Sequence, residues 1–260
     1  MSEFQYEVQK INDTAFMVSE GFTTMFVLAG ETQTLLIDCG LGVGDFQALV
    51  KTLAGDAPVT LAATHAHVDH IGGRGQFDEM AISAPEAALI RTCGASQRRR
   101  WLRRKQLTEH VSKEIRIRDE KKEPRVRIIK EGDTFDLGGG RVVEVMETPG
   151  HTKGSLSFYD RQQKILYAGD TVSSYLFLWL PHTATVEATL QSFYRMRSLD
   201  FELIWPCHHR RPFDRARFDG LVETLEQLAQ KKNTRLPLVK KFVRNGNRVF
   251  YRTSLVREKN

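Results

Sequence analysis

Seven consecutive residues, Thr64-His65-Ala66-His67-Val68-Asp69-His70, contain three histidines and one aspartate. Histidine and aspartate are costly to bury without a partner, so four such residues this close together are hard to explain as packing. The apolar run before them, Pro58-Val59-Thr60-Leu61-Ala62-Ala63, predicts a buried strand. Neutral imidazoles combined with carboxylates suit zinc, iron or manganese. The segment therefore predicts a metal site where a strand ends.

The spacing His-x-His-x-Asp-His in this segment resembles the metal signature of the metallo-β-lactamase-fold hydrolases. Four further segments resemble motifs of that family in the expected order: Leu35-Leu36-Ile37-Asp38-Cys39-Gly40, Thr148-Pro149-Gly150-His151-Thr152-Lys153-Gly154-Ser155, Leu166-Tyr167-Ala168-Gly169-Asp170-Thr171 and Leu203-Ile204-Trp205-Pro206-Cys207-His208. The matches run from about residue 16 to 208 and cover most of the chain. The resemblance implies an α/β fold, a four-layer αββα sandwich, in which a buried Asp38 braces the metal loop.

The resemblance also implies a dinuclear metal site with the ligands His65, His67, Asp69, His70, His151, Asp170 and His208. In the family arrangement Asp170 bridges the two ions. We expect two divalent ions of zinc, with manganese or iron as alternatives. Two ions about 3.5–4 Å apart can hold a hydroxide as nucleophile at neutral pH. Asp69 is a predicted catalytic residue, because it can accept the hydroxide's hydrogen bond and pass a proton to the leaving group.

The identity of residue 170 narrows the resemblance within the family. True zinc β-lactamases typically have Cys or Ser at this position, so Asp170 resembles the glyoxalase II, lactonase and nuclease branches instead. The expected reaction is hydrolysis of an ester-like bond, which is a thioester, a lactone or a phosphoester. Three alternatives stay open: a nucleic-acid phosphodiesterase, a mononuclear-iron sulfur dioxygenase and a non-catalytic metal-bound ligand sensor. The short interval from Asp170 to His208 disfavours the nuclease, because some of those members carry a large insertion there.

An aromatic run, Ser174-Tyr175-Leu176-Phe177-Leu178-Trp179-Leu180-Pro181-His182, follows Asp170. As a strand it would need burial on both faces. It is interpreted either as core packing or as an apolar wall for an acyl or aromatic substrate. Tyr175 and His182 are polar tips within the run. We predict both as catalytic residues that hydrogen-bond an oxyanion.

The last motif departs from the family pattern. Relatives commonly have Pro-Gly-His-Gly, whereas this chain has Pro206-Cys207-His208-His209. Cys207 is interpreted as a small residue in place of glycine, with a thiol that oxidises or binds metal as the alternative. His209 is interpreted as a solvated neighbour, with a ligand role as the alternative.

Positive charge is concentrated between Arg91 and Lys130, where fifteen Lys and Arg residues against five Asp and Glu residues give a local charge of +10. Since the whole chain carries +6, the remainder carries −4. Within the segment, Trp101 stands among Arg98, Arg99, Arg100, Arg103 and Arg104. Four interpretations stay open: a solvated face, attraction of an anionic or acyl small-molecule substrate, nucleic-acid binding or a membrane surface. A small-molecule substrate is the expected partner, with nucleic acid as the alternative.

Apolar periodicity predicts the elements around these motifs. Helices are expected after the loop 40–44, over 186–197 and around 218–229, and a strand over about 201–205. Leu107, Val111 and Ile115 form a narrow apolar stripe that predicts one more helix, within the basic segment.

The composition is that of a globular chain, with 41% hydrophobic and 27% charged residues in 260. We expect one domain over residues 1–260, with a helical insertion at about 93–125 and a C-terminal hairpin at about 240–254. No run approaches the roughly 20 apolar residues that span a bilayer, and no secretory signal is visible. Three scattered cysteines argue against a disulfide framework. A cytoplasmic location is therefore predicted.

Overall fold

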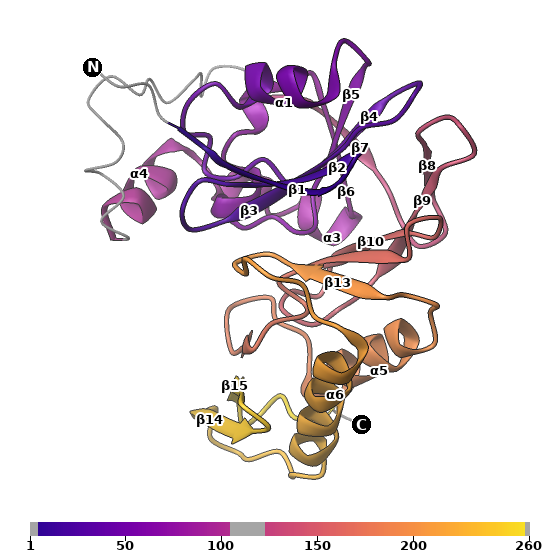
Figure 1. The fold of residues 1–260 in the computed structure, drawn as a ribbon. Helices are drawn as coiled ribbons and strands as arrows, with labels where there is room; N and C mark the ends of the chain where they lie inside the picture. The colour runs from indigo at the N-terminus through magenta and orange to yellow at the C-terminus, as the bar shows by residue number, and fades with distance from the viewer. Residues whose placement is uncertain (1–4, 105–122, 258–260) are drawn as a thin grey trace. The chain divides into compact units, whose positions relative to one another are not determined.

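The computed structural model describes residues 5–104 and 123–257. The chain forms two compact units, residues 1–143 (unit 1) and 144–260 (unit 2). Figure 1 colours the chain continuously by residue number, so the residues of each unit can be found from its bar. Each unit has its own hydrophobic core. The expected single domain over 1–260 stays a prediction. No helix in the described ranges is long and apolar enough to cross a membrane.

Unit 1 is organised around a seven-stranded sheet in the order β1-β2-β3-β4-β5-β6-β7. The first four strands are antiparallel, and β4 to β7 are parallel. The strands are β1 (Glu7–Asn12), β2 (Ala15–Ser19), β3 (Thr24–Leu28), β4 (Thr34–Ile37), β5 (Val59–Ala62), β6 (Glu79–Ile82) and β7 (Arg125–Ile128).

The parallel pair β4 and β5 positions the first part of the candidate site. Asp38 directly follows β4, and the segment Thr64–His70 follows β5. Since parallel neighbours end at the same edge of a sheet, the Asp38 turn and the histidine loop lie side by side. The helices of unit 1 connect and cover the strands: α1 (Phe46–Ala54), α2 (Val68–Ile71), α3 (Ala84–Ala87) and α4 (Ala95–Arg104).

Unit 2 contains β10, β11, β13 and most of β9 of a five-stranded sheet in the order β13-β11-β10-β9-β8, whose β8 belongs to unit 1, and all of a three-stranded sheet in the order β12-β15-β14. The first sheet is formed by β8 (Thr134–Asp136), β9 (Val142–Glu147), β10 (Leu156–Asp160), β11 (Ile165–Gly169) and β13 (Leu203–Pro206). The division between the units falls within β9. The second sheet is formed by β12 (Tyr175–Leu178), β14 (Val239–Arg244) and β15 (Asn247–Arg252).

Two helices of unit 2, α5 (Val186–Arg197) and α6 (Arg215–Ala229), lie side by side (Figure 1). Their contact includes Phe193 and Phe218, whose rings stack with centroids 5.2 Å apart. Apolar residues of both helices pack with β12 and β15 in one core. The loops at the ends of β9, β11 and β13 carry the three downstream motifs, so this core supports all of them.

The bounds of several elements agree with those expected from the sequence or differ from them by one or two residues. The helix expected over 186–197 is α5, and the strand expected over 201–205 is shifted to 203–206. β14 and β15 form an antiparallel hairpin whose turn has positive φ at Asn245 and Gly246, as a two-residue type I′ turn requires. Of the segment at about 93–125, residues 95–104 form α4. The stripe Leu107, Val111 and Ile115 lies outside the described residues.

The expectation that 174–182 needs burial on both faces is wrong. β12 alternates exposed and buried residues, with Leu176 and Leu178 in the core and Tyr175 and Phe177 exposed. The physical reason is that β12 is an edge strand of a small sheet that has its core on one side only.

A buried carboxyl group joins two turns of unit 1. Glu20 follows β2, and only 4% of its surface is exposed. Its Oε1 accepts a hydrogen bond from the backbone N–H of Leu41 at 2.5 Å. Gly40 passes so close that a Cβ there would lie 2.8 Å from the Glu20 carboxyl carbon. Burial raises the pKa of Glu20 to about 8.

This pKa predicts a stability that depends on pH. Between about pH 4.5, the ordinary value, and pH 8, the folded chain holds a proton on Glu20 that the unfolded chain releases. The free energy of unfolding should therefore fall as pH rises through that window. Glu20→Gln keeps an acceptor for Leu41 and should flatten this part of the profile in urea denaturation. The exposed Asp13→Asn serves as control; an equal slope in both variants would contradict the prediction.

Candidate metal centre

Asp38 holds the histidine loop of unit 1 in place. It is fully buried, with a φ of 61°. Its Oδ1 accepts a hydrogen bond from Thr64 N at 2.7 Å. Its Oδ2 accepts from Thr64 Oγ1 at 2.9 Å and lies 2.7 Å from His70 Nδ1. The expected brace by a buried Asp38 is confirmed.

These contacts set the tautomers of two histidines. Because a carboxylate only accepts, His70 donates its Nδ1–H to Asp38, which leaves the lone pair on Nε2. The Thr64 hydroxyl donates its hydrogen bond to Asp38. Its oxygen therefore accepts a hydrogen bond from His65 Nδ1 at 3.0 Å. His65 therefore also has its lone pair on Nε2. A metal ligand requires such a lone pair, and a histidine ligand usually donates its other N–H in this way.

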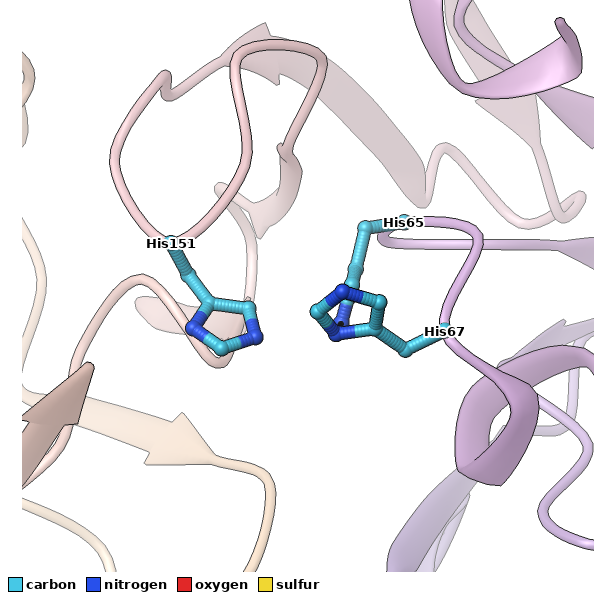
Figure 2. A group of neighbouring side chains, drawn as sticks. All are labelled: His65, His67 and His151. Atoms are coloured by element: carbon cyan, nitrogen blue, oxygen red, sulfur yellow. Dashed lines mark hydrogen bonds between the residues drawn. The ribbon is translucent and has the colours of Figure 1, made fainter. Parts of the chain in front are cut away.

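His65 and His67 follow β5 on the same loop (Figure 2). The Nε2 atom of His65 lies 2.9 Å from Nδ1 of His67, and the two rings meet edge to face with centroids 4.5 Å apart. His67 occupies the N-cap of the short helix α2, where its backbone is still extended. The turn into α2 therefore brings the ring nitrogens of these two residues together.

The peptide between these histidines is held on both sides. Glu86, with 1% of its surface exposed, accepts a hydrogen bond from Ala66 N at 2.7 Å. Cys93 donates its thiol to Ala66 O at 2.7 Å. Asp69 is also supported, since Thr23 Oγ1 donates to its Oδ2 at 3.4 Å. Glu86, Cys93 and Thr23 could not be identified from the sequence, because a helix-start glutamate, a lone cysteine and a loop threonine show no pattern.

The second cluster, His151, Asp170 and His208, belongs to unit 2. His151 follows β9, and its Nδ1 donates to the carbonyl oxygen of Phe177 at 3.1 Å, which leaves the lone pair on Nε2. Asp170 follows β11, and its Oδ2 lies 3.6 Å from His151 Nε2 and 3.3 Å from His208 Nε2. His208 follows β13 with a φ of 62°. Figure 2 shows His151 on its loop.

The donor atoms of the first cluster, formed by His65, His67, Asp69 and His70 in unit 1, and those of the second cluster in unit 2 each fit a divalent metal. Two atoms that bind one Zn²⁺ at about 2.0–2.1 Å in tetrahedral geometry lie about 3.3–3.4 Å apart. The distances of 3.3 and 3.6 Å around Asp170 Oδ2 are close to that value. In unit 1 the corresponding distance from His70 Nε2 to Asp69 Oδ2 is 3.8 Å. Each of the seven predicted ligands belongs to at least one group of neighbouring His, Cys, Asp or Glu side chains that could hold a metal ion.

The residues beside His208 have distinct surroundings. Cys207 is buried and its backbone N–H donates to Gly169 O at 2.9 Å. Its interpretation as a small residue in place of glycine stays a prediction. His209 is not a solvated neighbour. Its Nε2 lies 3.0 Å from Ser173 Oγ and its ring packs edge-on against Phe213. Burial lowers the pKa of His209 to about 4, with Arg217 contributing.

The two other predicted catalytic residues lie on the surface of unit 2. Tyr175 is 48% exposed, and its hydroxyl accepts a hydrogen bond from Arg248. His182 is exposed in a turn with a φ of 67°, and its carbonyl accepts from Lys153 N at 2.8 Å. Their oxyanion role stays a prediction.

The arginines of α4 differ in their exposure to solvent. Arg98 is buried, with 5% of its surface exposed, and donates to Gly72 O at 2.5 Å, just after the metal loop. Trp101 also faces inward and contacts the Phe22 ring edge-on at 4.8 Å. The exposed residues are Arg99, Arg100, Arg103 and Arg104. Arg98 and Trp101 therefore have a packing role that the sequence analysis did not separate from the charge run.

Removal of the Glu86 carboxyl should weaken the metal loop. Glu86→Ala leaves the buried Ala66 N–H without its acceptor, which should lower the free energy of unfolding by about 1–3 kcal/mol. Because the histidines on either side of Ala66 lose their support, zinc affinity should fall about tenfold or more. Urea denaturation and zinc titration against a chelator measure the two effects.

Two variants serve as controls for this prediction. Glu86→Gln keeps an acceptor for Ala66 and should recover most of both losses. Glu202→Ala removes an exposed glutamate and should change neither value. Normal zinc affinity in Glu86→Ala would show that Glu86 does not position the loop.

Comparison with known families agrees with these motifs. Residues 18–208 match the family model described as the metallo-beta-lactamase superfamily. The chain belongs to the metallo-β-lactamase superfamily.

Similar curated proteins include acyl-coenzyme A thioesterase MBLAC2 of Homo sapiens, 30% identical over 199 residues, which are 68% of this chain and 71% of that protein. The chain is 32% identical to MBLAC2 of Gallus gallus over 179 residues, 65% of this chain and 64% of that protein. It is also 32% identical to the hydroxyacylglutathione hydrolase of Bartonella quintana over 173 residues, 60% of this chain and 66% of that protein. The chain thus spans about two thirds of the length of these relatives.

Among solved structures, a metallo-beta-lactamase from Pontibacter korlensis covers 85% of this chain and 99% of its own, with a TM-score of 0.62 and 21% identity. At this identity the likeness shows the fold alone. The α/β metallo-β-lactamase fold expected from the sequence is confirmed.

Proposed function

We propose that this chain is a metal-dependent hydrolase that cleaves thioesters at a dinuclear metal centre. The observation that carries the proposal is the hydrogen-bond chain from Asp38, which leaves lone pairs on Nε2 of His65 and His70. A loop held in this way is suited to binding a cation, because both rings are oriented before the ion arrives.

In this proposal the two clusters supply one centre. By the family resemblance, one ion would be held by His65, His67 and His151, and the other by Asp69, His70 and His208, with Asp170 as a further ligand. The support is the order of the motifs along a chain of this superfamily and the fit of each cluster's donor atoms. Zinc suits four imidazole and carboxylate ligands per ion, with manganese and iron as alternatives.

Bound metal ions would polarise the substrate carbonyl and lower the pKa of a water molecule towards neutrality. Residues of the chain have two further roles: one transfers a proton, and another positions the metal-binding loop. Asp69 is the proposed proton carrier, because its carboxylate lies in the metal loop and Thr23 holds one of its oxygens. Asp38 acts as a positioning residue, since it touches the loop from the side opposite the lone pairs.

The names of the relatives favour a thioester over a lactone or a phosphoester. The MBLAC2 relatives are named acyl-coenzyme A thioesterases, and the Bartonella quintana relative is named for an acylated glutathione. An acyl group joined to sulfur is the chemistry that these names share.

Elemental analysis and a thioester assay test the proposal together. We expect two zinc or manganese ions per chain and hydrolysis of acyl thioesters by the purified protein. His67→Ala removes a proposed ligand and should lower kcat/KM at least about 100-fold, together with the metal content. Asp56→Ala removes an exposed carboxylate whose ion pair is with Lys51; it is the matched control and should leave both unchanged.

Three results would overturn the proposal. A single iron per chain would favour the sulfur dioxygenase alternative. Two bound ions without turnover of any thioester would favour either the phosphodiesterase or the ligand sensor. Full activity and metal content in His67→Ala would remove that residue from the site.

A further inference from the structure

The three-stranded sheet of unit 2 has one face in the core and one face outside. Leu176, Leu178, Val249 and Tyr251 point into the core. Since side chains alternate along a strand, their neighbours share the opposite side. This outer face consists of Tyr175 and Phe177 on β12, Arg248, Phe250 and Arg252 on β15, and Val239, Lys241 and Val243 on β14.

The outer face exposes an unusual amount of apolar surface. Tyr175 is 48% exposed, Phe177 38%, Val239 50% and Val243 55%. The rings of Phe177 and Phe250, which are paired across the strands, stack with centroids 5.3 Å apart at 20°. Contiguous exposed apolar groups on a folded chain mark a binding surface, because burial on binding releases their contact with water.

The charges on this face all have one sign. Its charged residues Lys241, Arg248 and Arg252 are cationic, and none of its eight residues is Asp or Glu. Two of the cations are held in place: Arg248 lies over the Tyr175 ring at 4.8 Å, and Arg252 donates to Trp179 O at 2.8 Å. Lys241 pairs with Phe250 in the β14–β15 register. Three cations therefore surround a stacked aromatic pair.

The outer face is also connected to the metal cluster of unit 2. The carbonyl oxygen of Phe177 accepts the hydrogen bond from His151 Nδ1 at 3.1 Å. The residue that orients a proposed ligand with its backbone thus presents its side chain on the outer face.

We propose that the outer face binds the nucleotide part of a coenzyme A thioester, which rests on the thioesterase function proposed above. Lys241, Arg248 and Arg252 pair with the phosphates, and Phe177 and Phe250 stack with the purine base. Among the thioester carriers in the relatives' names, coenzyme A combines a purine with phosphates, whereas glutathione has neither. The aromatic and cationic side chains of the outer face therefore favour coenzyme A over glutathione as the carrier of the acyl group.

Binding of desulfo-coenzyme A, measured by calorimetry, tests this assignment without any turnover. Lys241→Glu should raise the Kd about fivefold to tenfold, because an attraction to phosphate becomes a repulsion. Lys240→Glu is the matched control: it makes the same charge change on the same strand, but this position pairs with the inward-facing Tyr251 and should shift the Kd less than about twofold. Phe250→Ala, which removes half of the stack, should weaken binding while sparing the charges.

The outcomes separate this inference from the proposed function. Desulfo-coenzyme A binding that depends on Lys241 supports the face even if no thioester is hydrolysed. Thioester hydrolysis with equal kcat/KM for acyl-coenzyme A and for the matching acyl-N-acetylcysteamine would overturn the face and leave the hydrolase. Equal Kd values in Lys241→Glu and Lys240→Glu would also overturn it. Tighter binding of a 12-residue oligothymidylate, lost in Lys241→Glu, would replace the nucleotide carrier with single-stranded nucleic acid.

Discussion

The hydrogen bonds of Asp38 are the constraint on which the metal loop of unit 1 depends. One fully buried carboxylate accepts from a backbone N–H, a threonine hydroxyl and an imidazole N–H. A buried carboxylate is tolerable only when it is satisfied in this way. In return it fixes which nitrogen of His65 and of His70 carries a proton. The acceptor nitrogens on which metal binding depends therefore follow from one residue at the end of β4.

The same principle recurs at the peptide between His65 and His67. Glu86 and Cys93 hold the two polar groups of Ala66 from different elements, α3 and the turn before α4. The buried Arg98 adds a contact with Gly72 just beyond α2. The peptide between His65 and His67, which precedes α2, is thus held by buried polar partners although it belongs to no helix or strand.

In unit 2 the support comes from a strand rather than from a carboxylate. The carbonyl of Phe177 on β12 orients His151, and Asp170 lies within 3.6 Å of both histidine nitrogens of its cluster. Because β12 is covered on one side only, its other side presents aromatic and cationic groups. One edge strand therefore serves both the orientation of a proposed ligand and the surface beside it.

The sequence by itself determined the motifs, their order and the elements that carry them. A strand before His65, the helix over 186–197 and the Asn245-Gly246 turn could be predicted because periodicity and turn chemistry are local. The brace by Asp38 was available through family resemblance. The roles of Glu86, Cys93 and Arg98 were not, since each depends on a partner distant in the chain and has no local signature. Only the tertiary structure decided that Tyr175 and Phe177 face outward with Arg248, because the exposed side of an edge strand is set by what packs against the other side.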